Sequence, residues 1–130
     1  MNFATVETNG WQLLSAVERN QLHPSFWIPS EAERTSLQIG SLAQLLFEIH
    51  FSNTDDTEVE RMWVSLRRVE TWGYMGILLN QPSTLPENDS VYLTHGAEIP
   101  FTAEHIMEIR PATAEFENLE VFNRPTRIWS

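Results

Sequence analysis

The alternation of apolar and polar residues is clearest in the middle of the chain. Over residues 42–51 apolar side chains recur at every second position, which is the pattern of a strand with one buried face. Residues 59–69 alternate in the same way, with Met62, Val64 and Leu66 on one side. The polar, acidic segment between the two runs is short, so the pattern predicts an antiparallel hairpin.

Shorter elements follow this hairpin. The sequence predicts strands over residues 74–79, 91–94 and 106–109, with a helical turn near Thr102 before the last one. Gly76 lies inside the first of these strands and indicates a bend, a bulge or a close backbone approach. Residues 115–122 are compatible with either a strand or a helix, and Pro125 predicts an extended end.

The first forty residues have a helical period instead. Leucine and valine spacing predicts a helix over residues 11–21, with Asn9 as a possible N-cap and Pro24 after its end. Ser30 followed by Glu33 has the spacing of a capping box, which predicts a short helix over residues 31–37.

These elements predict an α+β fold. The connections between strands are too short for parallel crossovers, so we expect a small, strongly bent antiparallel sheet or an SH3-like barrel of about five strands. Two N-terminal helices would cover one end or one face of it. We expect a single domain over residues 1–130, with a helical region at 1–40, the sheet at 41–110 and a C-terminal extension at 111–130.

Composition narrows the classes of function. The chain has 130 residues, of which 42% are hydrophobic, enough for a folded core rather than a disordered chain. Its 18 acidic and 8 basic residues give a net charge of -10, which opposes binding to nucleic acid. There is no cysteine, so disulfides and thiolate chemistry are excluded. No apolar run approaches the length of a membrane span, and the first residues do not resemble a signal peptide, so we expect a cytoplasmic protein.

Four segments of the chain resemble a known family. They are residues 40–47, the strand Glu60-Arg61-Met62-Trp63-Val64, residues 74–82, which end in Asn80-Gln81-Pro82, and residues 99–109. Across roughly residues 25–110 the chain is similar to the YegJ-like family of bacterial domains of unknown function. The family often ends in Asp-Trp, where this chain has Glu108-Ile109. The resemblance implies no catalytic residues. Because some similar domains occur near toxin–immunity genes, it implies an inhibitory binding role.

The ionisable residues do not form a recognisable metal or catalytic motif. The histidines lack the paired spacing of metal ligands, and we interpret them as surface or loop residues: His23, His50, His95 and His105. The acidic segment lacks the spacing of a calcium loop and is interpreted as a solvated hairpin tip: Asp55, Asp56, Glu58 and Glu60. We therefore expect no cofactor and no metal.

An aromatic and arginine-rich surface is the strongest candidate site. Trp63 lies on the strand face opposite Met62 and Val64, and Trp, Tyr and Arg are enriched at binding hot spots. The candidate binding residues are Arg61, Trp63, Arg67, Trp72, Tyr74 and Asn80. With Arg68, two of these arginines form a basic strip suited to an acidic partner surface. Alternatively, Trp63 is a core residue, covered by the helix that carries Trp11 or stacked on Trp27.

Three functions remain open on this basis. The favoured one is a non-enzymatic module that binds another protein, in an immunity-type or regulatory role. The second is a small-ligand-binding barrel with an aromatic pocket at its mouth. The third is a hydrolase that uses Glu48, Glu58 or Glu60 with His50.

Overall fold

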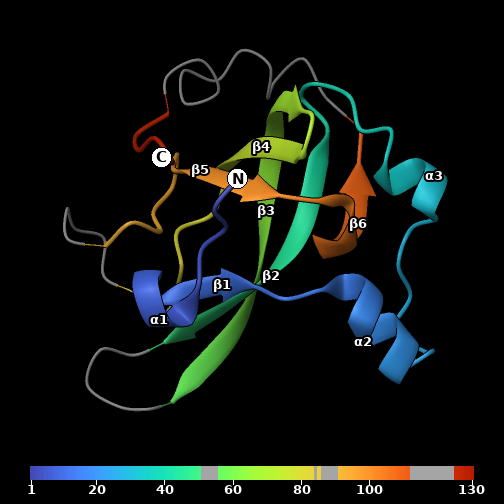
Figure 1. The fold of residues 1–130 in the computed structure, drawn as a ribbon, viewed down its shortest axis with the longest axis horizontal. Helices are drawn as coiled ribbons and strands as arrows, with labels where there is room; N and C mark the ends of the chain where they lie inside the picture. Colours follow the sequence, from blue (N-terminus) through green and yellow to red (C-terminus); the bar gives the residue numbers. More distant parts are fainter. Residues whose placement is uncertain (51–55, 84, 86–90, 112–124) are drawn as a thin grey trace.

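A computed structural model describes residues 1–50, 56–83, 85, 91–111 and 125–130 (Figure 1). Over these residues the fold is α+β, as predicted, and its sheet curls into a half-barrel. The helices are α1 (Val6–Asn9), α2 (Ala16–Leu22), α3 (Glu31–Arg34) and the short 3-10 turn η1 (Ala103–His105). The strands are β1 (Trp11–Leu13), β2 (Leu42–His50), β3 (Thr57–Glu70), β4 (Gly73–Leu78), β5 (Glu98–Phe101) and β6 (Ile106–Arg110).

The named strands pair only in the antiparallel sense, and the sheet is organised around β2. Its order is β1-β2-β3-β4-β5, and β6 also pairs with β2. Along one side, β2 pairs with β3 over its whole length, from Leu42↔Ser65 to His50↔Thr57. Along the other side, β6 pairs with the first half of β2 and β1 pairs with the second half. Because β1 and β6 pair with different halves of β2, the curled sheet continues beyond β2 on both halves of that strand (Figure 1).

Both faces of the sheet are buried near its centre. The concave face carries the main core, which includes Leu45, Phe47, Val64, Leu78 and Phe101. On the outer face, Leu46 packs with Ala16 of α2 and with Met107. This second cluster explains why three successive residues of β2, Leu45, Leu46 and Phe47, are all buried. A simple alternation with one solvated face would not require that.

The predicted helix over residues 11–21 is wrong in its first part. Residues Trp11–Leu13 form β1, in which Trp11 pairs with Ile49, and the helix begins only at Ala16. Gly10, with φ of 81°, makes the left-handed turn between α1 and β1. The N-cap of α2 is Ser15, whose hydroxyl accepts a hydrogen bond from the N–H of Glu18 (3.1 Å), rather than Asn9. Pairing with a distant strand therefore overrides the local helical period.

The predicted strand over residues 91–94 is also wrong. That segment is irregular, and the strand that pairs with β4 is β5, which begins at Glu98. Thr94 is nevertheless buried, and its hydroxyl donates to the side-chain oxygen of Gln81 (2.7 Å). Gly96, with φ of 94°, then turns the chain toward β5. The alternating pattern here reflects burial without strand pairing.

Other local predictions are confirmed. Ser30 and Glu33 form the predicted capping box of α3, although that helix ends at Arg34. The turn before β6 and the strand over residues 106–109 are present. At Gly76, an added Cβ would lie 3.1 Å from Val64 and from the ring of Phe101, so this glycine permits a close approach. The segment 115–122 lies outside the described residues.

None of the helices in the described part of the chain combines the length and apolar character needed to cross a membrane.

Candidate functional site

Trp63 lies in a groove on the outer face of the sheet. The alternation of β3 places Met62 and Val64 in the core and turns Trp63 the other way. The indole is partly exposed, and with Leu42, Leu79 and Asn80 it lines a groove of about 310 Å³. We refer to these four residues as the Trp63 groove. Trp63 is thus available for contact and is not sealed in the core.

Asn80 fixes one end of this groove. β4 ends at Leu78, but the next N–H, that of Leu79, still donates to the carbonyl of Trp63 (2.9 Å). The side-chain oxygen of Asn80 then accepts a hydrogen bond from the N–H of Trp63 (2.7 Å). The amide of Asn80 therefore replaces the backbone carbonyl that a longer β4 would have supplied.

One guanidinium group lies against the groove, and a second arginine lies on the same face of β3. The guanidinium carbon of Arg110 is 5.9 Å from the centre of the Trp63 ring, and Arg110 is also paired with Glu108 (2.9 Å). Arg61 precedes Trp63 by two residues on the same face and is exposed. Among the described residues, Arg61 belongs to no ion pair. One guanidinium thus lies against the Trp63 ring and a second arginine is exposed on the same strand face, in a strongly acidic chain.

Arg67 belongs to a different part of the structure. The register between β3 and β4 shifts between Leu66 and Arg68, so Arg67 falls in a β-bulge. This irregularity brings both arginines to Glu98, whose side chain is 1% exposed. One carboxylate oxygen of Glu98 lies 3.0 Å from Arg68 and 3.9 Å from Arg67, and the other accepts the N–H of Trp129 (3.2 Å). The predicted basic strip is therefore divided, because two of its three arginines neutralise a buried carboxylate.

The charge environment of Arg68 follows from this cluster. Burial acts to lower its pKa, but hydrogen bonds with the carboxylates of Glu70 and Glu98, together with their charge, outweigh burial and raise the pKa. Arg68 therefore stays charged, as an anchor for Glu98.

Trp72 and Tyr74 also lie away from the Trp63 groove. Tyr74 is a core residue, and its hydroxyl donates to the carbonyl of Arg34 (2.8 Å). Trp72 packs edge-on against Phe3, with ring centres 5.7 Å apart. Both residues line a second cavity, of about 320 Å³, at the turn between β3 and β4. Of the six predicted residues, the structure brings Trp63 and Asn80 together, places Arg61 on the same strand face as Trp63, and places the other three elsewhere.

The two predicted covers of Trp63 are the helix that carries Trp11 and the ring of Trp27. Trp11 lies in the inner core, with its ring centre 5.9 Å from that of Phe47, and it also stacks on Tyr92. Trp27 is 69% exposed. The segment that carries Trp11 is the strand β1 rather than a helix, and Trp27 does not stack on Trp63, so neither predicted cover has the form expected from the sequence.

The carboxylates proposed for hydrolysis lie on two different faces of the sheet. Glu48 pairs with Val59, and Glu58 pairs with the buried Ile49, so Glu48 and Glu58 point to opposite faces. Glu60 accepts hydrogen bonds from the N–H and the hydroxyl of Ser83 (2.9 and 2.7 Å). Glu48 and Glu58 are therefore separated by the sheet, and Glu60 is bonded to Ser83.

The histidines do not form a metal site within the described residues. No group of three histidine, aspartate or glutamate side chains there is placed to hold a metal ion. His105 is not a surface residue, because its side chain is only 12% exposed and its Nδ1 accepts the N–H of Thr102 (2.9 Å). Burial lowers the pKa of His105, and the nearby Glu104 opposes this effect only in part.

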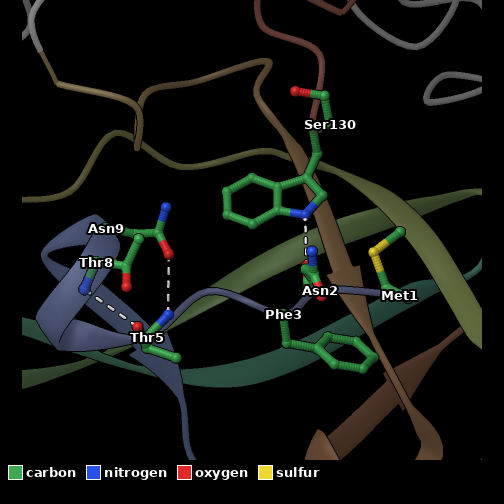
Figure 2. Close-up of a pocket in the computed structure, with 8 residues that line it drawn as sticks. Met1, Asn2, Phe3, Thr5, Thr8, Asn9 and Ser130 are labelled. Carbon is green, nitrogen blue, oxygen red and sulfur yellow. Dashed lines mark hydrogen bonds between the residues drawn. The ribbon is translucent and has the colours of Figure 1, made fainter.

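A further cavity lies between the first residues and the last two. It has a volume of about 450 Å³, and Figure 2 shows Thr5, Thr8 and Asn9 on one side of it and Met1, Asn2 and Phe3 on the other. The indole N–H of Trp129 donates to the carbonyl of Asn2 (2.9 Å), which joins the two segments. The sequence did not indicate this cavity, because its lining comes from residues more than one hundred positions apart.

The sequence also missed three residues beside Trp63: Leu42, Leu79 and Arg110. Leu79 has a local signal, because it directly precedes the predicted turn at Asn80. Arg110 and Leu42 meet only because β6 pairs with β2, in the register Leu42↔Arg110. Nothing in the alternating pattern specifies that pairing.

Comparison with known proteins gives no relative. No family model, curated protein or solved structure matches this chain. The resemblance to the YegJ-like family therefore stays a prediction.

Proposed function

We propose that this chain is a non-enzymatic interaction module that binds another protein through the Trp63 groove and the adjoining outer face of β3. The observation that carries the proposal is a partly exposed tryptophan in a groove, with Arg110 against its ring and Arg61 exposed on the same face of β3. Tryptophan supplies a large contact area with few rotatable bonds to fix, and tryptophan and arginine are enriched among the residues that dominate binding energies at protein interfaces. An immunity-type or regulatory role is the specific form of this proposal.

The geometry of the groove supports a fixed binding surface. The hydrogen bond from Trp63 to Asn80 holds the strand end, and Arg110 lies against the indole. A side chain held in place before binding loses less entropy when a partner arrives. Arg61 offers an exposed charge at the border, where it can guide an acidic side chain of the partner.

An affinity pull-down with the full chain as bait tests this function. The immobilised protein is incubated with an extract of its native host, and retained proteins are identified by mass spectrometry. Trp63→Ala removes the central side chain, and Trp27→Ala is the matched control because it removes an indole that is exposed elsewhere. We expect a specific protein that is retained by the parent chain and by the control and is lost with Trp63→Ala. Equal retention by both variants would contradict the proposal, provided that their thermal midpoints match that of the parent chain.

A second candidate function is binding of a small molecule in the cavity between Phe3 and Trp129. Its volume of about 450 Å³ is in the range of ligand pockets, and its lining combines aromatic rings with threonine and asparagine side chains. A thermal-shift screen of metabolites tests it, because a ligand of the native state raises the unfolding midpoint. The shift should disappear in Phe3→Ala and persist in Trp63→Ala.

A further inference from the structure

We propose that the segment recognised by this module is an extended, cationic strand that adds to the open edge of β3 between Thr57 and Arg61. This inference rests on the proposed function and names the partner's chemistry. It follows from the pairing of β3, from the direction of its main-chain groups and from the charges along the edge.

The two halves of β3 have different neighbours. β2 pairs with residues from Thr57 to Ser65, whereas β4 pairs only with residues from Val64 to Glu70. The first half of β3 therefore has β2 on one side and, among the described residues, no strand on the other. In Figure 1 this part of β3 lies at the lower margin of the molecule, with β2 and β1 above it.

The main-chain groups at this margin point outward. The N–H and the carbonyl of Leu66 bond to Ser41 and Gly40 on the β2 side, and the carbonyl of Trp63 bonds to Leu79 on the β4 side. Because these groups alternate along a strand, those of Thr57, Val59 and Arg61 face away from β2, as those of Trp63 do. Within the described residues, the main-chain groups of Val59 and Arg61 have no hydrogen-bond partner.

The open edge has a defined end at the Trp63 groove. There, Asn80 accepts the N–H of Trp63 and so occupies the position that an added strand would take. An added strand can therefore pair from Thr57 to Arg61, and its end reaches the groove. This arrangement is typical of strand addition, in which main-chain hydrogen bonds give affinity and neighbouring pockets give specificity.

A second copy of this chain is a poor occupant of the edge. An antiparallel pair must place the outward-facing residues 57, 59 and 61 of one copy opposite those of the other. Each register that does so sets a glutamate of one copy, Glu58 or Glu60, directly opposite a glutamate of the other. Like charges in that position are destabilising, and the net charge of -10 adds long-range repulsion.

The charges point instead to a strand with alternating cationic and apolar residues. Glu58 is exposed on one face of the edge and favours lysine or arginine opposite it. On the other face, Val59 is 43% exposed and lies in the same row as Arg61 and Trp63. That row favours apolar side chains, or an acidic one beside Arg61, and disfavours cations there. The occupant is therefore a partner strand that is cationic on one face and apolar on the other.

A pair of variants separates strand addition from surface charge. Val59→Pro removes an outward N–H without touching the hydrogen bonds to β2, as proline does at strand edges. Val59→Thr keeps the N–H and is the matched control. The probe is a fluorescein-labelled peptide of four Lys-Val repeats, with four Glu-Val repeats as its counterpart, and binding is followed by fluorescence anisotropy.

For the parent chain we expect the Lys-Val peptide to bind at least about tenfold more tightly than the Glu-Val peptide. Val59→Thr should change the affinity by less than about threefold, whereas Val59→Pro should weaken it by at least about tenfold. Glu58→Lys should reverse the preference between the two peptides. Equal affinities of Val59→Pro and Val59→Thr, or no preference between the peptides, would overturn the inference.

Hydrogen exchange gives a readout that does not depend on the variants. In the parent chain, the amides of Val59 and Arg61 should exchange more slowly when the Lys-Val peptide is bound, and unchanged exchange at both would also overturn strand addition.

Failure of strand addition can be distinguished from failure of the proposed function. If Trp63→Ala loses the native partner while Val59→Pro retains it, the interaction module stands and strand addition is wrong. If both variants retain the partner, both proposals fail.

Discussion

The side-chain oxygen of Asn80 accepts a hydrogen bond of 2.7 Å from the main-chain N–H of Trp63, at the point where β4 has already ended. This contact joins two residues that are 17 positions apart. It continues the hydrogen bonding of β3 beyond the last residue of β4. The open edge of β3, from Thr57 to Arg61, therefore ends beside the Trp63 groove. One asparagine thus separates the paired half of β3 from the half that we propose for binding.

Asn80→Ala should lower the free energy of unfolding by about 1 kcal/mol, because the N–H of Trp63 loses its acceptor. Asn80→Asp keeps an acceptor oxygen at the same place and is the matched control, with an expected loss of less than about half as much. Urea denaturation of both variants measures the difference. If the two variants unfold at the same urea concentration, the hydrogen bond does not have the assigned role.

Glu98→Ala should destabilise the fold more strongly. The buried carboxylate faces Arg67 and Arg68 and also accepts the N–H of Trp129. We expect a loss of about 2 kcal/mol, below the range for fully buried pairs because the guanidinium groups are partly solvated. Glu98→Gln keeps the shape and an acceptor and should cost about half as much. Denaturation at low and high salt checks the cause, since only the charge-dependent part should shrink with salt.

The hairpin of β2 and β3 could be predicted because its determinants are local. Apolar residues alternate over both strands and the connection is short, so pattern and chain order lead to the same pairing. The capping box of Ser30 and Glu33 is equally local. By contrast, Trp11 lies in a strand only because residues 47–49 of β2 offer it an edge, and no feature near Trp11 specifies that partner.

In the candidate site, too, the residues with local determinants could be predicted and those that depend on long-range pairing could not. Trp63 and Asn80 could be singled out, one by its place in an alternating strand and the other by the turn at Asn80-Gln81-Pro82. Their contact follows from the pairing of sequential strands. Arg67 was misplaced because the β-bulge shifts the register after Leu66, and a bulge of this kind leaves no clear mark in the sequence. Arg110 was missed because the β6–β2 pairing joins distant residues.

Gly76→Ala should destabilise the sheet through overpacking. The added methyl group would lie 3.1 Å from Val64 and from the ring of Phe101, both of which are fully buried. We expect a loss of about 1–3 kcal/mol in the free energy of unfolding. The double variant Gly76→Ala, Phe101→Leu tests the assignment, because a smaller side chain opposite the new methyl group should make the two losses less than additive. Strict additivity would show that the ring of Phe101 is not the obstacle.

His105 should make stability depend on pH below neutrality. Burial lowers its pKa in the folded state below the ordinary value of 6.5, so the unfolded chain binds the proton more readily. Stability is therefore highest above pH 6.5, where His105 is neutral in both states, and it falls as the pH decreases through the lower folded-state pKa. Urea midpoints between pH 7.5 and about 5.5 measure this slope, in a range where most carboxylates stay ionised.

Two variants test whether the pH dependence of stability comes from His105. His105→Asn provides a side-chain oxygen that can accept the N–H of Thr102 but does not titrate, so the pH dependence should flatten. His95→Gln is the matched control, because it removes an imidazole that is exposed elsewhere in the fold. If His105→Asn keeps the full slope, protonation of His105 is not the cause, because the only group that this variant removes from titration is its imidazole.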